Sequence, residues 1–200
     1  MMVVELTSVP SGALPLEAFK AQLRLGTGFG EDALQDDILE ALLRAALAAI
    51  EARTGKALLA RKFVWSVTGW RDQSGQVLPL APVSEIDALR LMSRSGAETV
   101  VDPSSYRLVQ DMHRPLLQPT GSLLPTISLG GMAEIELKAG FASDWAGIPP
   151  DLAQAVLLLA AHYYERRNDS DGERAVQIPF GVNALIERYR NLRLSSWSAP

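Results

Sequence analysis

A chain of 200 residues is long enough for one domain with its own hydrophobic core, or for two small domains. Its net charge of −4 and its pI of about 5.2 exclude a basic field over the whole molecule, of the kind that gathers nucleic acid. The absence of cysteine excludes disulfides, thiolate catalysis and cysteine-ligated metals, and it suits a reducing cytoplasm.

No segment of the sequence predicts secretion or membrane insertion. Residues 1–15 contain neither Lys nor Arg and no long apolar run, so they do not match a secretory signal. The most apolar stretch, residues 152–161, has about half of the roughly 20 residues that a bilayer-spanning helix needs. We therefore expect no membrane partner.

The pattern over residues 14–55 predicts two helices. A short helix over 16–25 precedes a glycine-rich turn at 26–30, and Asp32 with Gln35 forms a capping-box pattern that starts a longer helix. Gly55 supplies the C-terminal stop of this helix. Apolar residues at helical spacing predict its core face: Leu34, Ile38, Leu42, Ala45, Ala49 and Ile50, widened by Leu39, Leu43 and Leu47.

Residues 60–141 show the alternation of strands. Phe63, Trp65 and Val67 alternate with their neighbours in one predicted strand. The prolines within 78–83 confine that stretch to an edge or an irregular entry, because proline cannot donate to a central ladder. Residues 112–131 are rich in Pro and Gly and predict a loop. A second clear strand alternates apolar with charged positions: Ala133, Ile135, Leu137 and Ala139 against Glu134, Glu136 and Lys138.

Residues 149–194 are predicted to be helical again. Prolines at 149 and 150 open a helix in which residues 152–161 include a single polar side chain, Gln154. Such a helix must be covered on nearly all sides, and a neighbouring subunit is the cover we expect. A polar linker at 168–177 leads to a last helix over 179–194, and 195–200 form a mobile tail. The predicted fold is α+β, one domain over 1–200: a helical body, made of an N-terminal helix pair and two C-terminal helices, with an inserted antiparallel β subdomain.

The histidines do not match a metal-binding pattern. His162 and Glu165 are three residues apart on one predicted helix, but Arg166 stands where a zinc-protease pattern would need its second histidine. We interpret His162 as an ordinary histidine near a helix boundary, and we expect no metal and no cofactor.

An alternative of a different class comes from the strand before residue 140. Glu136 and Lys138, with Glu134, resemble half of a metal-dependent nuclease site, in which carboxylates hold a divalent cation and lysine positions the attacking water. The same three residues form the solvated face of an ordinary strand, which is the interpretation that we favour.

The C-terminal arginines indicate a protein contact. Acidic residues are interleaved with them, so they form no clean basic patch for nucleic acid. Arginine is enriched at protein–protein interfaces, and an aromatic residue on a mobile end often accompanies it as a binding hot spot. The residues concerned are Arg188, Arg190, Arg193 and Trp197.

Several short motifs follow one another along the chain. They are the helix 16–25 followed by a short gap, the helix end at 50–58, the Leu-Pro…Pro-Val entry at 78–83, Ala139-Gly140-Phe141, 148–152, 163–167 and 178–182. In this order and spacing they resemble the head–tail connector (adaptor) proteins of tailed phages. The sequence is also similar to the adaptors of bacterial gene transfer agents, which are phage-derived particles.

The resemblance implies a structural protein without enzymatic activity. Family members form a ring, usually dodecameric, beneath the portal protein in the neck of a particle assembled in the bacterial cytoplasm. This ring extends the DNA channel, lets DNA pass without specific binding and docks a downstream tail or stopper protein. Another neck or tail-completion ring protein is the alternative within this class. We expect portal contacts at the four C-terminal residues named above. We expect ring contacts on the helices 152–161 and 34–50, at Leu152, Val156, Leu158 and Leu159 on the first of these.

Overall fold

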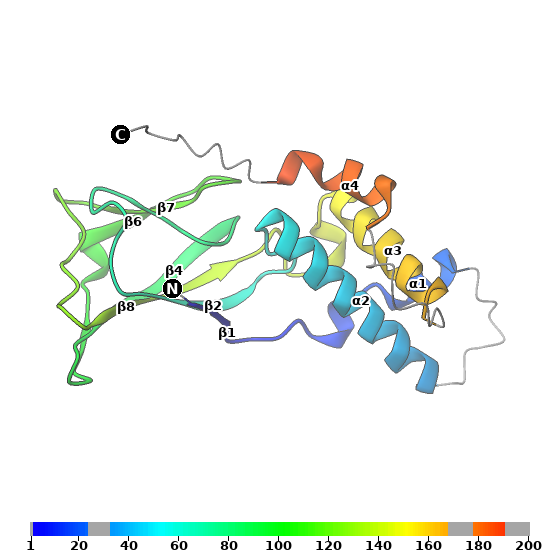
Figure 1. The fold of residues 1–200 in the computed structure, drawn as a ribbon, viewed down its shortest axis with the longest axis horizontal. Coiled ribbons are helices and arrows are strands. Elements are labelled where there is room, and N and C mark those ends of the chain that lie inside the picture. The colour runs from blue at the N-terminus through cyan, green and yellow to red at the C-terminus, as the bar shows by residue number, and fades with distance from the viewer. Residues whose placement is uncertain (1, 24–32, 168–177, 191–200) are drawn as a thin grey trace, which may run out of the picture.

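The computed structural model describes residues 2–23, 33–167 and 178–190. It places a helical body beside a β subdomain (Figure 1), so the predicted α+β class is confirmed. The body contains α1 (Leu16–Gln22), α2 (Ala33–Thr54), α3 (Pro150–Glu165) and α4 (Phe180–Ile186), with short 3-10 turns at Ser11–Ala13, Trp145–Gly147 and Glu187–Tyr189. The predicted cap at Asp32, the turn at 26–30 and the linker at 168–177 lie outside the described residues.

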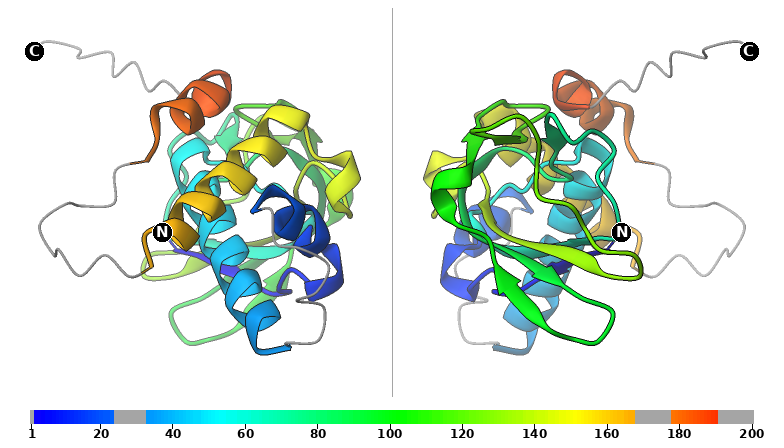
Figure 2. Two further views of the ribbon diagram at one scale, coloured as in Figure 1. Left: turned by 90° about the vertical axis from the view of Figure 1, so that its right-hand side faces the viewer. Right: turned by 90° about the vertical axis from the view of Figure 1, so that its left-hand side faces the viewer.

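The core of the body lies where α2 and α3 pack together. Figure 2 shows α3 crossing α2, with α1 and α4 on either side. Each buried leucine of this kind contributes roughly 1.5–3 kcal/mol. The buried residues are Phe19 of α1; Leu39, Leu43, Ala46, Leu47 and Ile50 of α2; Leu152, Ala155, Val156, Leu159 and Ala160 of α3; and Val182 and Ile186 of α4.

The core face of α2 differs from the predicted one. The widening residues Leu39, Leu43 and Leu47 are buried together with Ile50. By contrast Ile38 is 53% exposed, and Ala45 is exposed as well. The reason is that α2 is apolar around most of its circumference, so spacing alone does not identify which side meets α3.

The β subdomain consists of two antiparallel sheets. The larger has the order β1-β2-β8-β4-β5 and the smaller the order β3-β7-β6. Side chains from both sheets share one buried cluster. The strands are β1 (Met2–Glu5), β2 (Arg61–Val67), β3 (Gln76–Val77), β4 (Val83–Met92), β5 (Glu98–Val100), β6 (Tyr106–Val109), β7 (Leu116–Pro119) and β8 (Met132–Ala139), with a 3-10 turn at Pro103–Ser105 before β6.

The alternation predicted for β2 and β8 is confirmed. Trp65 and Ile135 are buried and lie opposite each other in the ladder, while Glu134 and Lys138 keep contact with solvent. The loop predicted over 112–131 is wrong in part, because β7 lies within it. Leu116 and Leu117 pair with both β3 and β6, and burial of Leu117 stabilises this pairing despite the neighbouring prolines.

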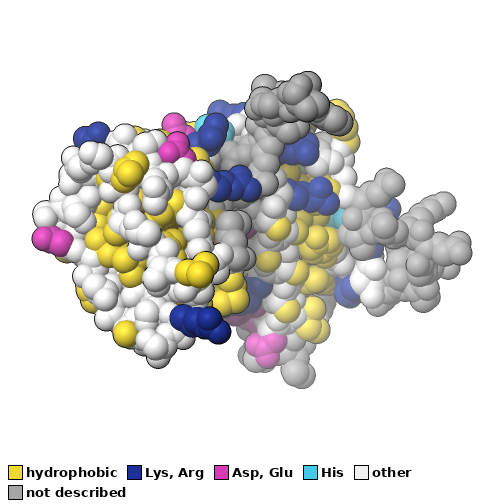
Figure 3. Space-filling view, turned by 60° about the vertical axis from the view of Figure 1, so that its left-hand side comes forward, with side chains coloured by type: hydrophobic (Ala, Val, Ile, Leu, Met, Phe, Trp, Pro, Cys, Tyr) yellow, Lys and Arg dark blue, Asp and Glu magenta, His cyan; other side chains and the backbone are white. Residues whose placement is uncertain are grey.

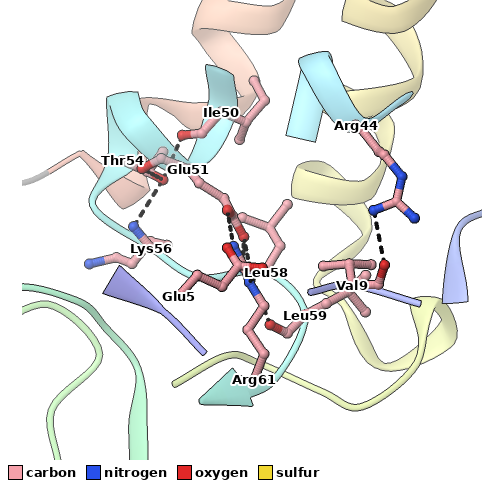
Figure 4. A network of polar contacts seen from close by, with 10 residues as sticks. All are labelled: Glu5, Val9, Arg44, Ile50, Glu51, Thr54, Lys56, Leu58, Leu59 and Arg61. Carbon is pink, nitrogen blue, oxygen red and sulfur yellow. Dashed lines mark hydrogen bonds and ion pairs between the residues drawn. The ribbon is translucent and has the colours of Figure 1, made fainter. Parts of the chain in front are cut away.

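An ion-pair network joins the two parts of the subunit (Figure 4). Arg61, at the start of β2, contacts Glu51 of α2 at 2.7 Å and Glu5 of β1 at 3.0 Å. The Glu51 carboxylate also accepts the backbone N–H of Leu58 at 2.7 Å. Burial on its own would lower the pKa of Arg61, but the hydrogen bond and charge of Glu51, aided by Glu5, outweigh burial and raise it. One side chain therefore links α2, β1 and β2.

Candidate interaction surfaces

The C-terminal segment is anchored to the start of α3. Asp151 accepts a hydrogen bond from the Tyr189 hydroxyl at 2.8 Å, and its other oxygen lies 2.9 Å from Nε of Arg188. The Arg188 guanidinium also hydrogen-bonds the Tyr189 hydroxyl and lies over its ring. Tyr189 meets Phe141 edge-on, with ring centroids 6.1 Å apart. Burial raises the pKa of Tyr189, and Asp151 adds to that effect against the opposing influence of Arg188.

The last helix is shorter than predicted. Regular α-helix ends at Ile186, a 3-10 turn continues to Tyr189, and the backbone is extended at Arg190. This short segment places Arg188 and Arg190 at the surface, and Arg190 has Glu187 as an ion-pair partner at 3.4 Å. Both predicted arginines are thus exposed but already paired. Arg193 and Trp197 lie outside the described residues.

Asp151→Ala is expected to loosen this C-terminal anchor. The Tyr189 hydroxyl would lose its acceptor and Arg188 its carboxylate, so trypsin should cut after Arg188 and Arg190 faster than in the unchanged protein. Limited digestion followed by mass spectrometry measures this. Asp87→Ala is the matched control, because Asp87 is equally buried but pairs with Lys62 in the β subdomain. Equal cutting in both variants would contradict the anchoring.

Three of the four predicted ring-contact residues are core residues instead. Leu152, Val156 and Leu159 are essentially fully buried by the subunit's own helices, so they offer no surface to a neighbour. Leu158 is half-buried. The apolar pattern correctly predicts that this helix is packed on most sides, but α1, α2 and α4 of the same chain provide most of the packing. Such a pattern does not distinguish packing within one chain from packing against a neighbouring subunit.

The residues of the nuclease alternative lie on the polar face of β8. Glu136 is engaged by Arg90 at 3.1 Å and approached by Lys62 at 4.0 Å. Lys62 pairs in turn with Asp87 at 3.0 Å, and that hydrogen bond raises the pKa of Lys62. Among the residues that the structure describes, no group of three or more His, Cys, Asp or Glu side chains could hold a metal ion. The arrangement is that of a sheet surface with cross-strand ion pairs.

Ring contacts are predicted on the helix 34–50, and the structure shows which side of α2 is free for them. The outward side carries a row of exposed apolar side chains, which we call the α2 ridge: Ile38, Ala41, Ala45, Ala48 and Ala52. Figure 3 shows hydrophobic side chains in a column over the helical body, on the side where α2 lies. The signal that could have found the ridge is the excess of alanine on both sides of this helix.

No helix within the described ranges is long and apolar enough to cross a membrane.

Comparisons with known proteins define the class of this protein. Residues 130–190 match the model of the phage gp6-like head-tail connector protein family. This stretch contains the motifs at 139–141, 148–152, 163–167 and 178–182 that carried much of the resemblance in the sequence. No curated protein matches the chain.

Solved structures resemble the chain over nearly its full length. A chain from the neck of an empty gene transfer agent (GTA) particle computed with C6 symmetry is 49% identical, with a TM-score of 0.88. Chains from the virion of the native GTA particle and from the native neck computed with C12 symmetry are 50% and 47% identical, with TM-scores of 0.86 and 0.83. Each match covers 98% of both chains.

The chain therefore belongs to the phage gp6-like head-tail connector family. Its solved relatives are structural proteins of GTA particles, which supports a structural connector role within such a particle.

Proposed function

We propose that this chain is the head–tail adaptor of a gene transfer agent. Copies of it form a ring beneath the portal, extend the DNA channel and dock the next neck or tail component. The observation that carries the proposal is the similarity, at 49% and 47% identity over 98% of the chain, to chains of GTA necks computed with C6 and C12 symmetry. Rotational symmetry of that order supports a closed ring of identical subunits, with twelve copies as the number we propose.

The proposed role involves no catalysis. The surroundings of Glu136, the central residue of the nuclease alternative, support this. Its carboxylate is paired with Arg90, and among the described residues no group of three or more His, Cys, Asp or Glu side chains could hold a metal ion. The net charge of −4 supports a conduit that DNA passes without specific binding, since like charges reduce the attraction to phosphates. The particle neck is the proposed location, after assembly in the bacterial cytoplasm.

Portal docking through the C-terminal segment is part of the proposal. Arg188 and Arg190 are exposed beside α4, and Phe180 at the start of this helix is 87% exposed, so charged and aromatic side chains lie on one short segment. Arg193 and Trp197 complete the proposed portal contact. Leu158, the half-buried member of the predicted ring-contact set, remains a proposed ring residue.

The test of the proposal is the mass of the protein in solution, measured by light scattering. The purified chain is run alone and then with the portal protein of the same particle. A ring-sized species, or co-elution with the portal from a monomeric start, is expected. A chain that stays at 21.7 kDa in both runs would contradict the adaptor function. Parallel runs with tail proteins separate a portal adaptor from another neck or tail-completion ring protein, which would bind tail proteins but not the portal.

The C-terminal variant for this test must keep α4. Val182, Ile186 and Tyr189 are buried, so removal of residues 179–200 would open the core and confuse unfolding with lost binding. Removal of 191–200 combined with Arg190→Glu spares these side chains. This variant should keep its unfolding midpoint and lose co-elution with the portal. Undiminished co-elution would contradict portal docking through the C-terminal segment.

A further inference from the structure

We propose that the α2 ridge is the face on which one copy of this chain receives the next copy in the ring. This inference rests on the proposed ring and assigns a surface to its subunit contact. Of the two helices on which ring contacts are predicted, it keeps α2, assigns the contact to the outward side of that helix and leaves out the buried side of α3.

The first argument is the distribution of apolar side chains around α2. Leu39, Leu43 and Ile50 face the subunit core, while Ile38 and the four alanines of the ridge face outward. No charged residue interrupts the ridge over its four turns. A helix that is apolar on both sides is normally covered on both sides, and the described residues cover only one.

The spacing of the ridge fits a helical partner. Its residues follow one another at intervals of three, four, three and four, which is the repeat of a helix–helix seam. Alanine at four of the five positions allows another backbone to approach closely, towards the short end of the roughly 8–10 Å range of packed helices. The ridge is therefore shaped for a long rigid element rather than for a small ligand.

Two features fix how a partner would sit. Asp37 is exposed at the beginning of the ridge and Arg53 at its end, and neither forms an ion pair with another described residue. Opposite charges at the two ends of an apolar seam select one direction and one register. Ile38 also borders a hollow of about 110 Å³ between α2 and the end of α3, lined by Tyr164 and Arg167. Such a hollow can receive an anchoring side chain of the partner.

A second copy is the occupant that the ring requires. Contacts in a ring of identical subunits are head-to-tail, so every copy must offer two different faces to its two neighbours. The necks that contain the 49% and 47% identical relatives were computed with C6 and C12 symmetry, so we expect a neighbouring copy on both sides of each copy. The ridge is an exposed apolar face of the helical body that runs along α2 from Ile38 to Ala52.

A single cysteine placed on the ridge tests the assignment in the assembled particle. The natural chain has no cysteine, so Ala45→Cys creates a unique maleimide target without disturbing the core. Ala18→Cys on α1 is the matched control, because Ala18 is an exposed alanine on a different helix. Labelling is compared between the free subunit and intact particles, and both variants must first be shown to enter particles.

The thiol of the Ala45→Cys variant is expected to react readily in the free subunit and at least about tenfold more slowly in the particle, while the thiol of the Ala18→Cys variant reacts alike in both. A benzophenone maleimide on the ridge thiol should then cross-link within the particle to a product of twice the chain mass. Undiminished labelling of the ridge thiol in particles would overturn the inference. So would protection already present in a chain that light scattering shows to be monomeric, or a cross-link to a different protein.

Failure of the adaptor function gives a different result. If the unchanged chain never enters particles or binds a portal, the proposed function itself is wrong. Should the chain assemble while the ridge thiol stays reactive, only the assignment of the ridge is wrong.

A second variant, Ala45→Glu, should keep the unfolding midpoint of the free subunit, because Ala45 is exposed, and should lose assembly. Its control, Ala18→Glu, should keep both the unfolding midpoint and assembly.

Discussion

Glu51→Gln is expected to lower the free energy of unfolding by about 3 kcal/mol, at the low end of the cost of breaking a buried ion pair. Glutamine can still accept the backbone N–H of Leu58, but the change removes the charge and one of the two oxygens that accept hydrogen bonds from Arg61. Arg61 is only 9% exposed and would keep Glu5, a more exposed carboxylate, as its remaining ion-pair partner. Urea unfolding followed by circular dichroism measures the loss.

Two further variants check the cause of that loss. Glu51→Gln combined with Arg61→Met removes both charges of the buried pair and should recover part of the stability, because no guanidinium is then buried with only the more exposed Glu5 as its partner. Glu17→Gln removes the exposed partner of Lys20 and should leave the unfolding curve unchanged. If the double variant is less stable than Glu51→Gln alone, the unpaired charge is not what destabilises the subunit.

Leu159→Ala is expected to lower the free energy of unfolding by about 2–5 kcal/mol, the usual cost of a cavity at a fully buried leucine. Leu159 packs in the core that α2 and α3 share, so its truncation should also weaken the packing of α3 against α2. Leu158→Ala, at the preceding residue of the same helix, should cost well under half as much because Leu158 is half-buried. Equal losses in the two variants would contradict the orientation of α3.

Most helices and the two clearest strands could be predicted because their signals are local. β2 and β8 alternate strictly, and α3 opens with proline at a helix start and is apolar over the turns that follow. The family resemblance, and with it the connector role, was found from short motifs that lie on these same elements. Their order along the chain is a property of the sequence and needs no knowledge of the packing.

The missed features depend on contacts between distant residues. β1 is exposed along its whole length and forms only because it pairs with β2, far along the chain. β7 is stabilised by pairing with β3 and β6 across a proline-rich segment. The faces of α2 and α3 were misassigned for a related reason. Both helices are apolar around most of their surface, and only the packed structure shows which side faces inward.

The place of α3 in the chain has a consequence for protein synthesis. The core residues Leu43 and Leu159 belong to one cluster, although the strands from β2 to β8 separate them in sequence. A nascent or truncated chain that lacks α3 would expose Leu39, Leu43 and Leu47 to water and to proteases. The order of the elements therefore makes burial of this side of α2 depend on synthesis of the chain through α3.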